Sequence, residues 1–126
     1  MNKLQDYNIT KNFKYSEMIC KDGTEVPDQY QNYMLICVTE LQALRDKLGK
    51  PITITSAYRI PAWNKQVGGT RNSYHLKAQA VDIKVKGLKP YDLAIWAARY
   101  TNFNGFGIAD SFIHLDLRSR FTIFKY

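Results

Sequence analysis

The stretch that decides the fold is residues 73–85, which read SYHLKAQAVDIKV. Its second half predicts a β-strand, because apolar side chains alternate there with small or charged ones. Asp82 lies between Val81 and Ile83, so its carboxylate points to the face opposite theirs. A carboxylate in so apolar a strand needs a cation or hydrogen-bond donors to offset its desolvation. His75 lies seven residues earlier, so a metal ion is one cation that the two residues could share.

The chain has two histidines, and the second also lies beside an aspartate. His114 precedes Asp116 by two residues within 111–118 (SFIHLDLR), a predicted strand in which such residues share a face. With the first histidine and Asp82, His114 completes a set of two imidazoles and one carboxylate. This set leaves the fourth position of a zinc ion for water, as hydrolytic zinc sites do. Spacing alone leaves a second interpretation open, in which both histidines are ordinary hydrogen-bonded groups.

The other predicted elements surround these strands. Apolar residues recur at three- and four-residue steps over 28–48, which predicts a helix that ends at Gly49. Residues 90–100 form a second predicted helix that opens on a proline. Further predicted elements are a strand at 52–55, a helical turn near 62–67 and a strand at 121–126. We expect an α+β fold, a small antiparallel sheet with helices on one face and the metal cleft on the other.

Length and composition predict a single domain. The 126 residues, 45% hydrophobic and 23% charged, suit one compact globular unit over 1–126, with 1–11 as a loosely ordered lead-in. We expect a monomer. Cys20 and Cys37 lack a CxxC spacing and are expected to stay reduced.

The net charge of +7 favours polyanionic partners, and both cell-wall polymers and nucleic acids qualify. The 18 Lys and Arg residues are scattered rather than run together, so charge alone does not choose. No stretch approaches the roughly 18 to 20 apolar residues of a membrane span. Residues 1–7 lack the features of a secretory signal, so we expect synthesis in the cytoplasm and delivery by other means.

The ordered motifs resemble a known family. The S-x-H-x6-D pattern at 73–82, followed by H-x-D at 114–116, resembles the zinc D-Ala-D-Ala carboxypeptidase family of metallopeptidases, peptidase family M15. The likeness is to its compact branch, found in bacteria and phages, and it covers about residues 13–118. Three further segments match that branch: F-x-x-x-E-x-x-C-x-x-G at 13–23, a counterpart of S-G-x-R at 56–59, and N-x-x-V-G-G at 64–69.

The resemblance implies roles for individual residues. The zinc ligands would be His75, Asp82 and His114. Arg59 would bind the substrate carboxylate or the developing oxyanion, a task that suits a planar guanidinium. Ser73 would orient the ligand loop or contact substrate. Tyr74 flanks the expected cleft, and we expect it to contact substrate as well.

The sequence departs from the family pattern at the catalytic acid. The position three residues before the final histidine, where many relatives carry the acid, is Ser111. Strand alternation favours Asp116 as the proton shuttle over Asp110, although Asp116 could equally steady a ligand or pair with Arg118. Two glycines of the family are Ala57 and Ala78 here, and alanine adopts a positive φ only at a cost.

The implied function is zinc-dependent hydrolysis of peptide bonds in the stem or cross-bridge peptides of bacterial peptidoglycan. The enzyme would be a D-Ala-D-Ala carboxypeptidase, or a murein endopeptidase of the endolysin type. Phages as well as bacteria encode such enzymes, so a phage origin is open. No nucleic-acid partner is expected. The hedgehog signalling domain has the same scaffold, so a catalytically silent zinc-binding domain is an alternative. A basic nucleic-acid-binding module is the second alternative.

Overall fold

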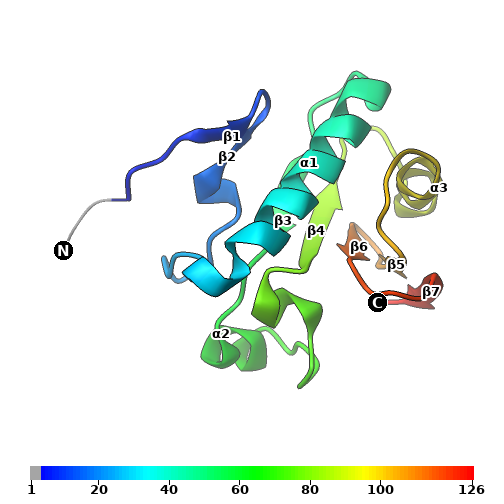
Figure 1. Cartoon of the computed structure of the whole chain (residues 1–126). Coiled ribbons are helices and arrows are strands. Elements are labelled where there is room, and N and C mark those ends of the chain that lie inside the picture. The colour runs from blue at the N-terminus through cyan, green and yellow to red at the C-terminus, as the bar shows by residue number, and fades with distance from the viewer. Residues whose placement is uncertain (1–3) are drawn as a thin grey trace.

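A five-stranded sheet organises the chain, and the structure, a computed structural model, describes residues 4–126 (Figure 1). Neighbouring strands run antiparallel, except that the last strand of the chain runs parallel to its partner at one edge. In spatial order the strands are β3 (Thr53–Ser56), β4 (Ala80–Lys84), β6 (Ile113–Asp116), β5 (Gly105–Ile108) and β7 (Thr122–Lys125).

Two long helices lie over the sheet and contact each other (Figure 1). They are α1 (Gln31–Leu48), which ends at Gly49 with a left-handed φ of 65°, and α3 (Pro90–Tyr100). The short helix α2 (Pro61–Gln66) lies elsewhere, close to the turn that carries His75. The remaining helical turns are η1 (Tyr15–Glu17), η2 (Asp28–Tyr30) and η3 (Tyr74–Lys77).

The two faces of the sheet differ in character. One face is apolar and packs with the buried side of α1 in a single core. Because side chains alternate along a strand, Asp82 and His114 point to the opposite face. The predicted α+β fold, with helices on one face and a polar cleft on the other, is therefore confirmed. The sheet and α1 contribute these fully buried residues: Val81, Ile83, Phe106, Ile113, Leu115, Met34, Cys37, Val38, Leu41 and Leu44.

The N-terminal segment is more ordered than the predicted lead-in over 1–11. Strand β1 (Asn8–Thr10) pairs with β2 (Phe13–Lys14), and the Thr10 hydroxyl donates to Gln42 Oε1 of α1 at 2.8 Å. Asp6 accepts two hydrogen bonds from Ser16. These contacts fasten the segment to the domain, and only residues 1–3 of the predicted lead-in lie outside the described residues.

Strand β5 was not predicted, because its sequence GFGI contains two glycines, which are rare in strand interiors. Its presence also changes the end of the sheet. The predicted last strand forms, as β7, but it pairs with β5 rather than with β6. The sheet is consequently antiparallel with one parallel pair.

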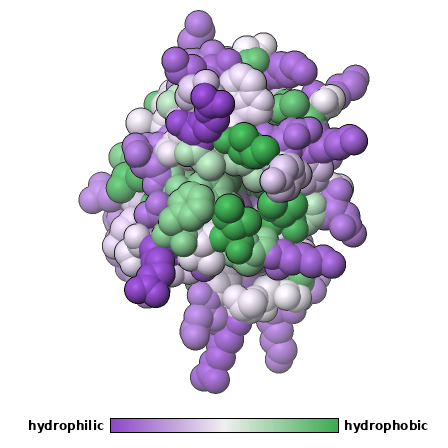
Figure 2. Space-filling model, turned by 90° about the vertical axis from the view of Figure 1, so that its right-hand side faces the viewer, coloured by the Kyte–Doolittle hydropathy of each residue, from purple (hydrophilic) through white to green (hydrophobic). Residues whose placement is uncertain are grey.

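The side of the molecule that carries α3 and β7 shows an apolar patch ringed by hydrophilic side chains (Figure 2). Large hydrophobic side chains exposed on or beside these elements include Ile95, Phe121 and Ile123. Within residues 4–126, no helix combines the length and apolar character that a membrane crossing demands.

Both cysteines are buried and free, as expected from their spacing. Burial raises the pKa of the Cys37 thiol, and the nearby charge of Asp116 adds to the effect. Cys37 therefore stays a thiol and fills the core under the Ala78 carbonyl, 3.7 Å away.

Candidate metal centre

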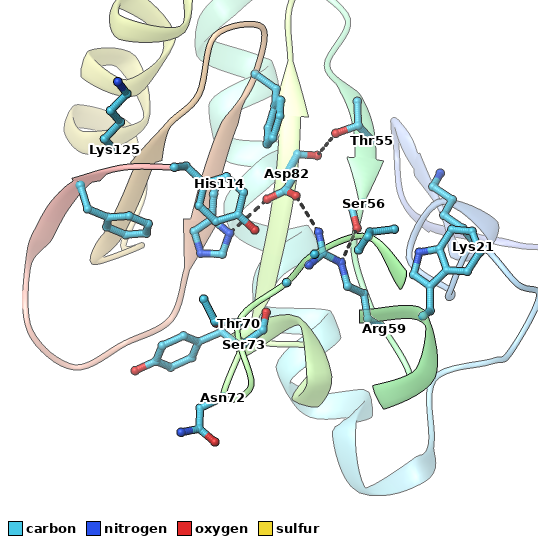
Figure 3. A pocket seen from close by; sticks show the side chains of 18 of the residues that line it. Lys21, Thr55, Ser56, Arg59, Thr70, Asn72, Ser73, Asp82, His114 and Lys125 are labelled. Carbon is cyan, nitrogen blue, oxygen red and sulfur yellow. Dashed lines mark hydrogen bonds and ion pairs between the residues drawn. The ribbon is translucent and has the colours of Figure 1, made fainter. Parts of the chain in front are cut away.

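Three potential ligand atoms converge on the polar face of the sheet. Figure 3 shows two of the three residues, Asp82 and His114, with their side chains facing each other. Asp82 Oδ1 lies 3.1 Å from His75 Nε2 and 3.1 Å from His114 Nδ1, and the two nitrogens are 3.3 Å apart. All three side chains are buried. Residues far apart in the sequence thus meet within a triangle of nearly equal sides.

The local structure explains why they meet. Asp82 of β4 and His114 of β6 are direct partners in the antiparallel register, so their side chains leave the same face side by side. His75 reaches them from η3, whose first turn is capped by the Ser73 hydroxyl accepting from the His75 amide at 3.2 Å. Ala78 then turns the chain into β4 with a φ of 57°. The alanine therefore adopts the left-handed conformation at the position where the family has glycine.

In each imidazole, the ring nitrogen that points away from the cluster forms a hydrogen bond with an acceptor. His75 Nδ1 lies 2.6 Å from the Ala57 carbonyl oxygen, which can only accept, so this nitrogen carries a proton. His114 Nε2 lies 2.7 Å from Asp116 Oδ2 and donates to that carboxylate. In neutral imidazoles the inner nitrogens then present lone pairs. Three acceptors therefore face one another, and a shared cation is what relieves their repulsion.

The triangle fits zinc. A tetrahedral zinc ion with bonds of about 2.0–2.1 Å holds neighbouring ligand atoms roughly 3.3 Å apart. The three measured separations lie within a few tenths of an ångström of that value. Two imidazole nitrogens and one carboxylate oxygen are also the donor set of hydrolytic zinc sites.

The protonation preferences of the three residues suit a cation as well. Burial lowers the pKa of His75. Burial raises the pKa of Asp82, but the hydrogen bonds that its carboxylate accepts whenever the His114 or His75 ring carries a second proton outweigh burial and bring the pKa to about 2. For His114, burial lowers the pKa and hydrogen bonds with Asp116 and Asp82 raise it overall. Near neutral pH the cluster therefore holds an ionised carboxylate beside a neutral His75.

Arg59 lies against the other oxygen of Asp82. Its NH2 group is 3.2 Å from Asp82 Oδ2, and Nε donates to Ser56 Oγ at 3.0 Å (Figure 3). The NH1 group donates to Asn64 Oδ1 at 3.1 Å. These three bonds use three of the five N–H donors of a guanidinium. Arg59 also lines the pocket, so the predicted substrate-binding residue lies beside the predicted ligands.

Asp116 lies behind His114 rather than in the pocket. The carboxylate is fully buried, and it accepts from His114 Nε2 and from Arg118 through both Nε, at 2.8 Å, and NH2, at 2.7 Å. Burial raises its pKa, but the hydrogen bonds from Arg118 and His114 hold that pKa well below its usual range. These contacts favour the alternative left open by the sequence, in which Asp116 steadies a ligand. Asp110 is exposed and also lies outside the pocket lining.

A pocket of about 670 Å³ opens over the cluster. Ser73 and Tyr74 are among the residues that line it, together with two aromatic residues that the sequence analysis missed, Phe124 and Tyr126. The Tyr126 ring stacks on His114 with centroids 4.6 Å apart. The spacing of two between Phe124 and Tyr126 was the available signal, because it places both rings on one face of a strand.

The sheet has helices on one face and, on the other, a buried cluster of two histidines and one aspartate under a pocket. These features define a class of proteins, those with a three-ligand metal site of the hydrolytic kind. The sequence profile of the family described as Peptidase M15 matches residues 11–116. The chain belongs to this family. The predictions of the family and of zinc as the fitting metal are confirmed, and both agree with the predicted enzyme class, a zinc metallopeptidase.

A curated relative is similar over much of the same region. The zinc D-Ala-D-Ala carboxypeptidase of Streptomyces albus G is 34% identical over 88 residues, which is 64% of this chain and 34% of the relative. The chain thus matches about a third of that relative's length.

Proposed function

We propose that this protein is a zinc-dependent peptidase that hydrolyses peptide bonds in the stem or cross-bridge peptides of bacterial peptidoglycan. The observation that carries the proposal is the triangle of His75 Nε2, Asp82 Oδ1 and His114 Nδ1 beneath an open pocket. Family membership and the name of the carboxypeptidase relative support the reaction and its substrate. We propose these three residues as the zinc ligands.

The surrounding side chains can orient a peptide over the cluster. Zinc, when bound, lowers the pKa of a water ligand and polarises the scissile carbonyl. Arg59 keeps two donors free after its bonds to protein, and these can hold a substrate carboxylate or a developing oxyanion. The Ser73 hydroxyl accepts from a backbone amide, so its own proton remains free to donate to a substrate carbonyl. Tyr74 forms part of the wall against which the peptide would lie.

The charges of the pocket support an anionic peptide as substrate. Four cationic side chains line it, Lys21, Arg59, Arg118 and Lys125, against one carboxylate, Asp82. Lys21 and Lys125 lie at opposite ends, with Asp82, His114 and Arg59 between them (Figure 3). A cleft lined by one sign of charge attracts ligands of the other sign. Peptidoglycan peptides carry several carboxylates, which matches this arrangement.

We propose that residues 1–126 act as one catalytic domain. Because lysines lie at both ends of the pocket, a peptide that extends to either side of the scissile bond would meet a cationic side chain. This supports an endopeptidase, of the murein endopeptidase or endolysin type, alongside the carboxypeptidase reaction in the relative's name. A phage lysis enzyme is the setting we propose for it.

One observation favours the silent zinc-binding alternative. Among the residues that line the pocket, Asp82 is the one carboxylate, and it is committed to the cluster and Arg59. Asp116 can act on the reaction only through His114, since both of its oxygens are occupied behind that ring. Among the described residues that line the pocket, none is therefore a free carboxylate that could act as the general acid. The position of that acid in many relatives is Ser111 here.

The test combines metal analysis with digestion of defined muropeptides by wild type and His75→Ala. We expect one zinc per chain, cleavage that chelation abolishes and zinc restores, and loss of both zinc and cleavage in the variant. One zinc per chain with no cleavage of any muropeptide supports the silent domain. Absence of zinc binding in the folded wild-type protein contradicts both functions.

A further inference from the structure

The side chain of Arg118 is held from several directions at once. Its Nε and NH2 groups form a forked pair with the two oxygens of Asp116, and its backbone amide donates to Asp116 Oδ1 at 3.1 Å. The guanidinium lies over two aromatic rings, 5.0 Å from the centroid of Tyr74 and 4.8 Å from that of Phe124. Such cation–π contacts fix the plane of a guanidinium as well as its position.

From these contacts we infer that Arg118 is a positioning residue for the third metal ligand. It fixes the Asp116 carboxylate, which in turn fixes the orientation and tautomer of His114. The inference rests on the proposed zinc site. It extends to a residue beyond the family match, which ends at Asp116.

The contribution of Arg118 follows from the alternatives open to the Asp116 carboxylate. A carboxylate released from Arg118 can rotate, and it then no longer holds the proton of His114 on Nε2. If that proton moves to Nδ1, the nitrogen that faces Asp82 and His75 is blocked as a ligand. The forked pair prevents the rotation, because both carboxylate oxygens are bound in one plane. Outer partners of metal-binding histidines act in this way at many zinc sites.

A different role is also open to Arg118, because it lines the pocket and is partly exposed. A residue that only binds substrate would change KM and leave zinc binding untouched. A residue that positions His114 changes zinc binding in the absence of any substrate. The two roles therefore separate in one measurement.

The experiment compares the zinc affinity of wild type, Arg118→Met, Arg118→Lys and Arg120→Met by competition with a chromophoric chelator. Methionine keeps much of the length and the contact with the rings but removes the fork. We expect about 10- to 100-fold weaker zinc binding in Arg118→Met and a smaller loss in Arg118→Lys. Arg120 is exposed and outside the pocket lining, so Arg120→Met should match wild type.

A second measurement reads the tautomer of His114 directly. Nitrogen NMR of the metal-free protein at alkaline pH should show His114 protonated on Nε2 in wild type and a mixture of the two tautomers in Arg118→Met.

Circular dichroism of the metal-free proteins shows which variants are folded. If Arg118→Met does not fold, the zinc affinity of Arg118→Lys tests whether Arg118 positions His114. Unchanged zinc affinity and an unchanged His114 tautomer in a folded Arg118 variant overturn the inference, and a rise in KM alone assigns Arg118 to the substrate instead. These outcomes leave the proposed function intact. If folded wild type binds no zinc, the proposed function and the inference fail together.

Discussion

At the scale of the single residue, Asp82 divides its two oxygens between two tasks. Oδ1 faces the two imidazoles, and Oδ2 accepts from Arg59. The guanidinium thus prevents the carboxylate from turning both oxygens toward one metal ion. Asn64 completes this arrangement, because it accepts from Arg59 and donates to the Thr70 carbonyl at 2.8 Å. One buried amide therefore connects the loop after α2 to the orientation of a ligand.

A substitution at Gly69 tests this connection between Asn64 and Arg59. A Cβ at residue 69 would overlap the Asn64 side-chain amide and approach Arg59 NH1 to 2.9 Å. We expect Gly69→Ala to lower the free energy of unfolding by about 1–3 kcal/mol, as overpacking does, and to raise KM by displacing Arg59. Gly49→Ala is the control, since residue 49 lies outside the pocket lining and has open space around it but a φ of 65°. It should lower the melting temperature and leave KM unchanged; equal KM values for the two variants would contradict the role given to Arg59.

At the scale of the element, β5 makes room for the side chains of its neighbours. Its glycines lie on the polar face, where Gly105 is paired with Asp116 and Gly107 with His114. A Cβ at residue 105 would overlap the Asp116 carboxylate. At residue 107 it would approach the Phe124 ring to 2.8 Å, the Tyr126 ring to 2.9 Å and His114 Cβ to 3.0 Å. The second ring could then not stack on His114.

Gly105→Ala is accordingly expected to weaken zinc binding by displacing Asp116 from His114. The clash involves a buried carboxylate, so we expect a loss of about 1–3 kcal/mol in the free energy of unfolding as well. Chelator competition and urea unfolding measure the two effects. Gly23→Ala provides the comparison, because residue 23 lies in an exposed turn outside the pocket lining, with a φ of 95° and open space around it. It should cost stability alone, and an equal drop in zinc affinity there would refute the specific role of Gly105.

The elements differ in how well the sequence predicted them. Residues 90–100 form α3 with the predicted bounds, and 28–48 differs from α1 only in that η2 occupies its first turn. Both helices bury one apolar stripe, which a period near 3.6 reveals. Strand β5 escaped prediction, because its glycines serve the neighbouring side chains and carry no pattern of their own. The convergence of ligand atoms likewise came from the family likeness, since the spacing of two histidines does not fix how strands pair.

At the scale of the whole molecule, four of the 18 Lys and Arg residues, which are scattered along the sequence, come together at the pocket. Reversing the charge at its ends, with Lys21→Glu or Lys125→Glu, should raise KM for muropeptides about 3- to 10-fold at low salt, since each exposed charge contributes roughly 1 kcal/mol or less. The effect should shrink as ionic strength rises, and kcat should change little. Lys86→Glu makes the same change in net charge outside the pocket lining and serves as the control. Steady-state kinetics that rank the three variants equally would show that net charge, rather than its placement, attracts the substrate.

Removal of zinc should affect the stability of the entire domain, because the three ligands join β4, β6 and the η3 turn across the sheet. Without a cation, three buried acceptors face one another, and the unfolded chain escapes that repulsion. An ion that binds only the folded state stabilises it by about 2.7 kcal/mol when its free concentration is 100 times its dissociation constant. We therefore expect the melting temperature of wild type to fall on chelation and to recover on addition of zinc, as measured by calorimetry.

In Asp82→Asn the same treatment should shift the transition far less, because the amide replaces an anionic ligand and weakens the pairing with Arg59. A melting temperature in wild type that ignores both chelator and zinc would mean that the triangle holds no metal, and its three acceptors would then have to share protons instead.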